Sequence, residues 1–188
     1  FPALARIPRV ALGEWPTPVQ LAGATGTGLP PHLWIKRDDL ASPTLGGNKV
    51  RALEFLLAGL APGDVVLTAG GEGSTHVLAT AMYARRLGAS VVGMRWRHEM
   101  NQGAYRVAEM ITEQCASSPV YGNATIAILR TQLARLTQRC RYIPLGGSTP
   151  LGALAHVNAA LELAAQVRAG ELPAPKRVVV PLGSGGTV

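Results

Sequence analysis

Short apolar runs, each followed by a turn and then by a helical pattern, constrain the fold of this chain more than any other feature. In the clearest case, the apolar run at 64–69 leads into a glycine-rich turn at 70–76 and a helical repeat over 77–87. The same alternation predicts further strands at 89–94 and 141–145 and further helices at 103–114, 124–139 and 151–169. This order is typical of a parallel sheet with right-handed crossover helices, so we predict an α/β fold.

The two ends of the chain differ from its middle. Residues 1–31 are rich in Pro and Gly and predict an extended arm with short strands, followed by one more short strand at 33–36. Near the other end, the apolar run at 177–182 predicts a strand that is buried on both faces. Because the chain starts at Phe1 and stops at Val188 directly after a glycine turn, we expect that both ends are incomplete.

Composition excludes several classes of function. The 188 residues are 47% hydrophobic, so the chain buries a core, and the net charge of +7 comes from scattered arginines with only 5% aromatic residues. This pattern does not favour nucleic-acid binding, which uses aromatic platforms, but it suits a small anionic ligand. No run is long enough to span a membrane, and the four histidines lack the spacing of metal ligands. Two distant cysteines indicate a reducing compartment, so we expect a cytoplasmic protein.

Lys49 stands where the turn Gly46-Gly47-Asn48 becomes the first turn of a helix predicted over 49–60. The positive end of the helix dipole disfavours a cation there, so a partly desolvated lysine would have a lowered pKa and be a better nucleophile. A solvated surface lysine is the alternative, and Lys49 considered alone favours it.

The stretch Gly183-Ser184-Gly185-Gly186-Thr187 directly follows the apolar run near the C-terminus. Free backbone N–H groups in such a turn form a concave nest that binds phosphate. The stretch does not match a nucleoside triphosphate loop, and it fits a dinucleotide site only weakly. A tight structural turn remains the alternative.

Several polar residues have both a chemical and a structural interpretation. Ser74 is either a nucleophile or proton carrier, or the N-cap of the helix that follows it, and no hydrolase triad or GxSxG motif accompanies it. His76 is more typical of a hydrogen-bonded structural histidine. The adjacent carboxylates at 38 and 39 form an acid/base pair or, as we favour, a turn with an ion pair to Arg37 or Lys36. Ser148 is expected to cap the helix at 151–169.

The combination of these features narrows the chemistry. An activated lysine and a phosphate nest, with no metal site, triphosphate loop or triad, are what a pyridoxal phosphate enzyme requires. The lysine would hold the aldehyde of this cofactor as a Schiff base, and the nest would hold its phosphate.

The motifs also resemble a known family, that of 1-aminocyclopropane-1-carboxylate deaminase and D-cysteine desulfhydrase. The resemblance rests on motifs that follow one another in the right order over most of the chain: Lys36–Leu40, Gly46–Lys49 with Arg51, Leu53 and Glu54, Thr68–Gly71 before Ser74 and His76, Ile143–Ser148, and Gly183–Thr187. It implies the tryptophan synthase β-like fold (fold type II), with two open parallel-sheet α/β domains. Residues 1–49 and 157–188 would belong to the large cofactor-binding domain, and 50–156 to the small α/β domain.

The resemblance also implies roles for particular residues. Lys49 would be the Schiff-base lysine, and Ser74 would be a second catalytic residue that moves a proton. Substrate would be bound by Ser74, Thr75 and His76. Cofactor contacts would come from Lys49, Asn48, Thr75, Gly183, Ser184, Gly185, Gly186 and Thr187. The implied reaction is elimination or ring-opening deamination of a small amino acid to a keto acid and ammonia, and we expect a homodimer.

Three positions depart from the family pattern. Thr75 replaces an asparagine, Ala52 replaces a basic residue that assists the phosphate, and Glu72 replaces a neutral residue. These departures leave two alternatives open. One is other chemistry on the same fold, namely β-replacement, dehydration or racemisation. The other is a non-catalytic relative that binds an anionic ligand.

Overall fold

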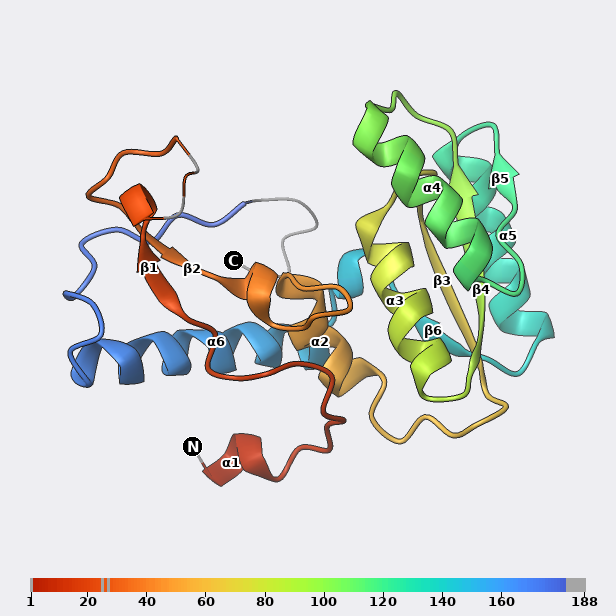
Figure 1. Ribbon diagram of the computed structural model, residues 1–188. Coiled ribbons are helices and arrows are strands. Elements are labelled where there is room, and N and C mark those ends of the chain that lie inside the picture. Colours follow the sequence, from red (N-terminus) through yellow and green to blue (C-terminus); the bar gives the residue numbers. More distant parts are fainter. Residues whose placement is uncertain (1, 25, 27, 182–188) are drawn as a thin grey trace.

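A computed structural model describes residues 2–24, 26 and 28–181 of the chain, which form two lobes (Figure 1). One lobe contains a four-stranded sheet and three helices that alternate along the chain. In order, these elements are β3 (Val65–Gly71), α3 (Thr75–Arg86), β4 (Ser90–Trp96), α4 (Gln102–Gln114), β5 (Val120–Tyr121), α5 (Ala124–Thr137) and β6 (Arg141–Ile143).

The sheet of this lobe is parallel throughout, with the strand order β5-β4-β3-β6. Helices α3 and α4 cover one face and α5 covers the other (Figure 1). Side chains alternate between the two faces of β3, because successive residues of a strand point to opposite sides. Val66 therefore lies in the larger core cluster, shared with α2 and α3, whereas Leu67 packs on the opposite side with Ala134 of α5.

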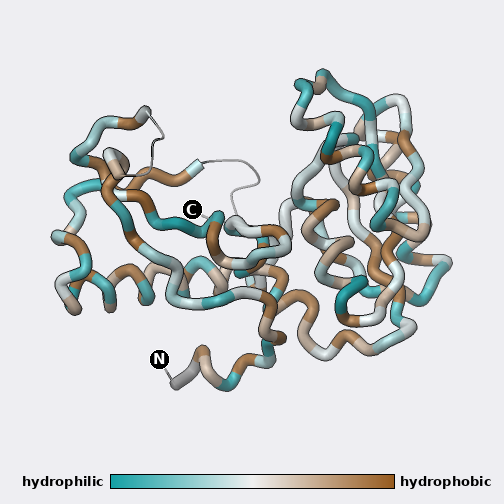
Figure 2. Tube along the Cα trace, in the orientation of Figure 1, coloured by the Kyte–Doolittle hydropathy of each residue, from teal (hydrophilic) through white to brown (hydrophobic). Residues whose placement is uncertain are grey.

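Helix α5 buries one side, marked by Ala127, Thr131 and Ala134, whereas α2 is buried at every residue from Val50 to Leu56. Hydrophobic and hydrophilic residues alternate along the tube in Figure 2. The core beneath α3 is densely filled: Leu53, Leu57, Val66 and Tyr83 are each no more than 1% exposed. Burial of a large apolar side chain contributes ~2 kcal/mol, so this cluster is a major source of stability. The expected α/β fold with a parallel sheet is confirmed.

The second lobe holds the N-terminal arm and the last helix. Strands β1 (Val19–Leu21) and β2 (Trp34–Lys36) pair in antiparallel fashion and lie above α6 (Pro150–Arg168) in Figure 1. The lobe also contains α1 (Pro2–Ala5) and the 3₁₀ turns η1 (Ala22–Ala24) and η2 (Asp38–Leu40). Helix α2 (Asn48–Leu56) packs against both α6 and α3 and so joins the two lobes.

Glu54 fixes the N-terminal arm to α2. Its carboxylate oxygen Oε1 accepts hydrogen bonds from the backbone N–H groups of Leu12 and Gly13 and from the indole Nε1 of Trp15, at 3.0, 3.2 and 2.9 Å. Its carbonyl accepts another from the N–H of Val10. Since Glu54 is only 3% exposed, these donors offset the cost of burying its charge.

Two expectations about the C-terminal third are wrong. Residues 177–181 form no strand, and Val178 and Val179 are 65% and 91% exposed. A strand buried on both faces needs neighbours for its N–H and C=O groups, and the described residues contain none for this segment. Helix α6 is capped by Thr149, whose Oγ1 accepts from the N–H of Gly152 at 2.9 Å, and not by Ser148.

Candidate active site

Both glycines of the turn before Lys49 are required by the backbone. A Cβ on Gly46 would overlap with the carbonyl oxygen of Asp39, and Gly47 has a φ of 109°, which side chains disfavour. The N–H of Gly47 donates to the carbonyl of Asp38 at 2.6 Å. The turn is also tied to the sheet lobe, because the hydroxyl of Tyr83 on α3 donates to the carbonyl of Leu45.

Lys49 lies in the first turn of α2, as the sequence predicts, although the helix begins one residue earlier, at Asn48; Lys49 is half-buried. Burial disfavours the charged ammonium, and this lowers the pKa of Lys49. A larger fraction of the amine is therefore neutral at a given pH than for a lysine in water. This is the property that nucleophilic attack on a carbonyl requires.

β3 is a central strand of the sheet, with β4 on one side and β6 on the other, and the chain leaves β3 and β6 at their neighbouring carboxyl ends. The charge of Lys49 acts on His76, which lies on the helix after β3, so Lys49 lies near these carboxyl ends. Ligands of open α/β sheets bind at such ends. The loop after β6 forms the turn η3 (Leu145–Gly147), and a Cβ on Gly147 would lie 3.2 Å from Leu56, 3.6 Å from Ala52 and 3.9 Å from His76. Helices α2 and α3 therefore meet the turn at this residue.

His76 is the buried polar group of this junction. It is 5% exposed, its Nε2 shares a 3.1 Å hydrogen bond with the hydroxyl of Thr68, and Nδ1 has no hydrogen-bond partner among the described residues. Burial and the positive charge of Lys49 lower its pKa to about 4, an effect that the carbonyl of Pro144 partly offsets. His76 is therefore a neutral imidazole at physiological pH, and the charge of Lys49 acts on it.

Ser74 and Thr75 directly precede His76, where the loop after β3 becomes α3. Ser74 is the N-cap of α3, where its Oγ accepts from the N–H of Val77, so the capping interpretation is confirmed. The donor O–H of Ser74 is not used by this bond. Thr75 is the first residue of α3 and is exposed, whereas Glu72 is half-buried at the end of β3. The hydroxyls at 74 and 75 thus stand at the carboxyl end of the sheet.

His156 on α6 also lies near Lys49, although no sequence motif singles it out. It is half-buried, and its pKa is lowered first by burial and then by the positive charges of Lys49 and Arg51, against the opposing charge of Asp38. A signal was present in the sequence. His156 is four residues after Gly152 and next to Ala155, both buried against the rest of the fold, and residues at this spacing share a helix face.

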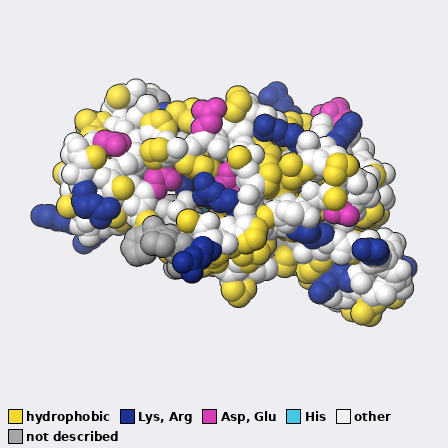
Figure 3. All heavy atoms as spheres, turned by 90° about the horizontal axis from the view of Figure 1, so that it is seen from below, with side chains coloured by type: hydrophobic (Ala, Val, Ile, Leu, Met, Phe, Trp, Pro, Cys, Tyr) yellow, Lys and Arg dark blue, Asp and Glu magenta, His cyan; other side chains and the backbone are white. Residues whose placement is uncertain are grey.

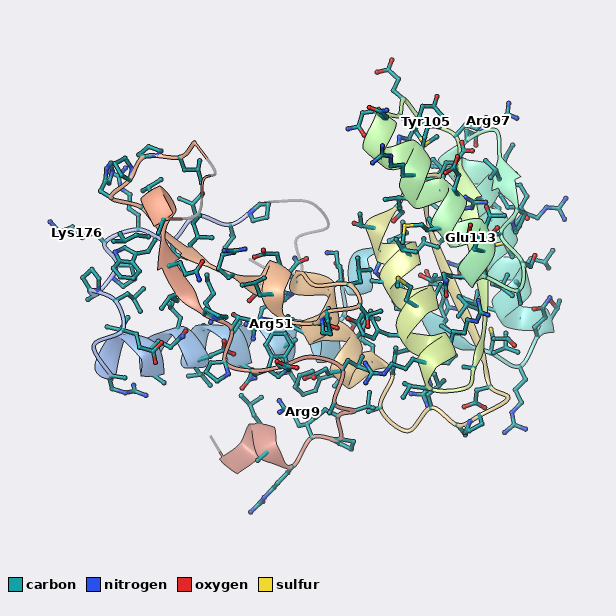
Figure 4. The ribbon with its side chains drawn as sticks, viewed as in Figure 1. Arg9, Arg51, Arg97, Tyr105, Glu113 and Lys176 are labelled. Atoms are coloured by element: carbon teal, nitrogen blue, oxygen red, sulfur yellow. The ribbon has the colours of Figure 1, made fainter. Side chains whose placement is uncertain are left out.

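The two carboxylates at 38 and 39 separate. Asp39 pairs with Arg37, as expected, and this ion pair lowers the pKa of Asp39. Asp38 instead pairs with Arg51 on α2, at 2.7 Å. Arg51 is 3% exposed and lies where α2, the arm and α6 meet (Figure 4).

The remaining predicted site residues have a simpler account. Asn48 is the first residue of α2, next to Lys49. The stretch from Gly183 to Thr187 lies outside the described residues.

Within the described part of the chain, no three His, Cys, Asp or Glu residues are grouped as metal ligands, and no helix is long and apolar enough to cross a bilayer. Lys and Arg side chains lie in separate groups on the face in Figure 3.

A parallel α/β sheet with a low-pKa lysine beside its carboxyl edge fits the class of enzyme that binds the aldehyde of pyridoxal phosphate. Residues 10–188 match the family described as pyridoxal-phosphate dependent enzyme, and the chain belongs to this family. The chain is 35% identical to a D-cysteine desulfhydrase of Salmonella paratyphi B and 37% identical to the nocardicin C-9' epimerase of Nocardia uniformis, over 98% and 96% of its length.

A solved structure supports the same assignment. The crystal structure of an ACC deaminase homologue superposes with a TM-score of 0.74 and 32% identity over 100% of the chain. The resemblance stated from the motifs is thereby confirmed. The chain covers 57–59% of the length of these three relatives.

Proposed function

We propose that the whole protein is a pyridoxal phosphate-dependent lyase or deaminase. Its substrate would be a small amino acid similar to D-cysteine or 1-aminocyclopropane-1-carboxylate, and its products a keto acid and ammonia. The observation that carries this proposal is the half-buried Lys49, whose pKa is lowered, at the start of α2 in a chain of this family. The names of the relatives support the substrate class.

The described residues fit such a cofactor at its reactive end. Pyridoxal phosphate supplies an aldehyde that condenses with amines and a ring that withdraws electrons from the substrate's α-carbon. The half-buried Nζ of Lys49, whose pKa is lowered by burial, is suited to hold that aldehyde and, once displaced by substrate, to take a proton at the α-carbon or an adjacent carbon. The proposed cofactor contacts of Asn48, Thr75 and the residues 183–187 would position the remaining groups.

The substrate side of the proposal assigns Ser74 and Thr75. The hydroxyl of Ser74 keeps its proton available while it caps α3, so it is suited to deliver one during ring opening or elimination. Thr75 is suited to contact the substrate because it is exposed at the start of α3. The burial of His76 favours an indirect contribution, in which its neutral ring supports the loop edge near Lys49.

The decisive experiment uses the full-length protein and Lys49→Ala. Bound pyridoxal phosphate gives a visible absorbance band that depends on its bond to a lysine, and we expect this band and all turnover to be absent in Lys49→Ala. Lys176→Ala, which removes an exposed lysine at the far end of the lobe that contains α6 (Figure 4), should retain both. An unchanged band in Lys49→Ala would reject the assignment.

Product analysis separates the proposed reaction from its main rival. Release of ammonia and keto acid from D-cysteine or 1-aminocyclopropane-1-carboxylate, with sulfide from D-cysteine, supports the lyase or deaminase. Inversion of an amino acid's α-carbon without ammonia release supports racemisation or epimerisation. The epimerase of Nocardia uniformis at 37% identity favours this second candidate.

The domain division, location and assembly are also proposals. A large domain of 1–49 and 157–188 and a small domain of 50–156 are supported by the two lobes (Figure 1), and their bounds fall inside α2 and α6. A cytoplasmic location is supported by Cys115 and Cys140, which are both free thiols. A homodimer is supported by apolar side chains exposed on α5, among them Leu129 and Leu136, and light scattering of the full-length protein would test it.

A further inference from the structure

Six polar side chains from five parts of the chain converge beside the start of α2, and we call them the Arg51 cluster. They are Thr17 of the arm, Lys36 of β2, Asp38 of η2, Arg51 of α2, and Glu162 and Gln166 of α6. The cluster contains two cations and two carboxylates, so its formal charges cancel. Each carboxylate has a basic partner, which is the arrangement that buried charges require.

Arg51 is the centre of this cluster and uses both ends of its guanidinium. Its Nε and Nη2 donate to the two carboxylate oxygens of Asp38 at 2.9 and 2.7 Å, and its Nη1 donates to Glu162 Oε2 at 2.8 Å. The guanidinium also stacks 3.9 Å from the ring centre of Trp15. Arg51 therefore fastens α2 to η2 on one side and to α6 on the other.

Asp38 holds the helix start at two points. Its carboxylate binds Arg51, and its carbonyl accepts the N–H of Gly47. Lys49 lies between these two attachment points in sequence, so one residue of η2 fixes the backbone on both sides of it. Glu162 is held in turn by Lys36, by Arg51 and by the backbone N–H of Thr17.

We propose that Arg51, Asp38 and Glu162 are positioning residues, which hold the first turn of α2 so that the amine of Lys49 stays half-buried at the junction of the two lobes. The proposal rests on the proposed function only for the role of that amine. The planar fork of arginine is essential to it, because a lysine ammonium is a point charge on a flexible stem and cannot pair with Asp38 in two-point fashion while also reaching Glu162.

The test uses two variants that keep every charge but alter the geometry, Arg51→Lys and Glu162→Asp. In the full-length protein freed of pyridoxal phosphate, labelling of Lys49 by acetic anhydride is followed across pH by peptide mass spectrometry. A looser helix start exposes Lys49 to water and raises its pKa. We expect the midpoint of labelling to rise by about one pH unit, which lowers the labelling rate near neutral pH by about tenfold.

Arg86→Lys is the matched control, since Arg86 is exposed on α3, and its labelling midpoint should equal that of the wild type. Amide hydrogen exchange of residues 48–51 gives a second measure and should be faster in both variants. Glu162→Asp, the smaller change, decides the matter if Arg51→Lys does not fold. An unchanged midpoint and unchanged exchange, even with a lower melting temperature, would overturn the proposal and leave the cluster a purely structural feature.

The two proposals fail in different ways. If Lys49 does not bind the cofactor, the visible band does not depend on Lys49, but the labelling midpoints still respond to the variants. If the positioning proposal is wrong, the band depends on Lys49 while the midpoints do not move.

Discussion

Ala52 follows Arg51 on α2, and its side chain faces the interior. It is 4% exposed and lies against the turn at Gly147 and the cluster of α2 and α3. The family pattern has a basic residue here that assists the phosphate. In this chain, neighbouring side chains pack around position 52, so a small apolar residue fits there and a long basic side chain does not.

Introducing a charge at position 52 should therefore destabilise the fold. We expect Ala52→Lys to lower the free energy of unfolding by ~3 kcal/mol, because the ammonium would be buried without a carboxylate partner. Urea unfolding measures the change, with Ala160→Lys on the exposed side of α6 as a control that should lie within about 0.5 kcal/mol of the wild type. A fully stable Ala52→Lys protein would show that this position opens toward the site.

At the scale of elements, the start of α6 shows how a cap is selected. Pro150 occupies the first helical position, and the residue before a proline is driven into an extended conformation. Thr149 has φ −139° and ψ 160°, which are N-cap angles, and its hydroxyl reaches the N–H of Gly152. The proline was therefore a better indicator of the cap than the choice of Ser148 by residue type.

Removing this cap should cost a measurable amount of stability. We expect Thr149→Ala to lower the free energy of unfolding by ~1 kcal/mol, since an N–H group at the helix start loses its acceptor. Thr125→Ala is the matched control, because Thr125 is exposed inside α5 and caps nothing. Equal losses in the two variants, measured by urea unfolding, would mean that Thr149 contributes nothing as a cap.

At the scale of the whole molecule, the Arg51 cluster makes stability depend on pH. Burial alone would raise the pKa of Glu162, but the hydrogen bonds from Arg51 and Lys36 outweigh it and lower the pKa to about 2. The unfolded state binds a proton at about pH 4.5, so the contribution of Glu162 is fully present above that pH. It is lost as the pH falls from about 4.5 toward 2.

Glu162→Gln tests this linkage between pH and stability. We expect the variant to be less stable than the wild type at pH 7 and to lose less further stability between pH 4.5 and 2, because one linked proton is removed. Urea unfolding at a series of pH values gives the slope of unfolding free energy against pH for the wild type and for the variant. Glu113→Gln, an exposed carboxylate on α4, should keep the slope of the wild type, and an equal slope in Glu162→Gln would contradict the linkage.

Local patterns in the sequence were sufficient for the features that depend on near neighbours. The alternation of strands and helices, the start of α2 at Gly47 and Lys49, and the cap at Ser74 are set by side-chain period and by backbone angles within a few residues. The family motifs follow one another along the chain in the order found in the family, so they too could be recognised in the sequence. They were sufficient to predict the class of enzyme.

Tertiary structure alone decided which distant groups meet. Arg51 binds Glu162 across 111 positions, and Thr17 binds it across 145, so no local pattern could specify these pairs. The burial of Ala52 and the approach of His76 and His156 to Lys49 likewise follow from the packing of α2 between two lobes. The valines at 178–180 show the converse, since an apolar run becomes a strand only where partner strands are present.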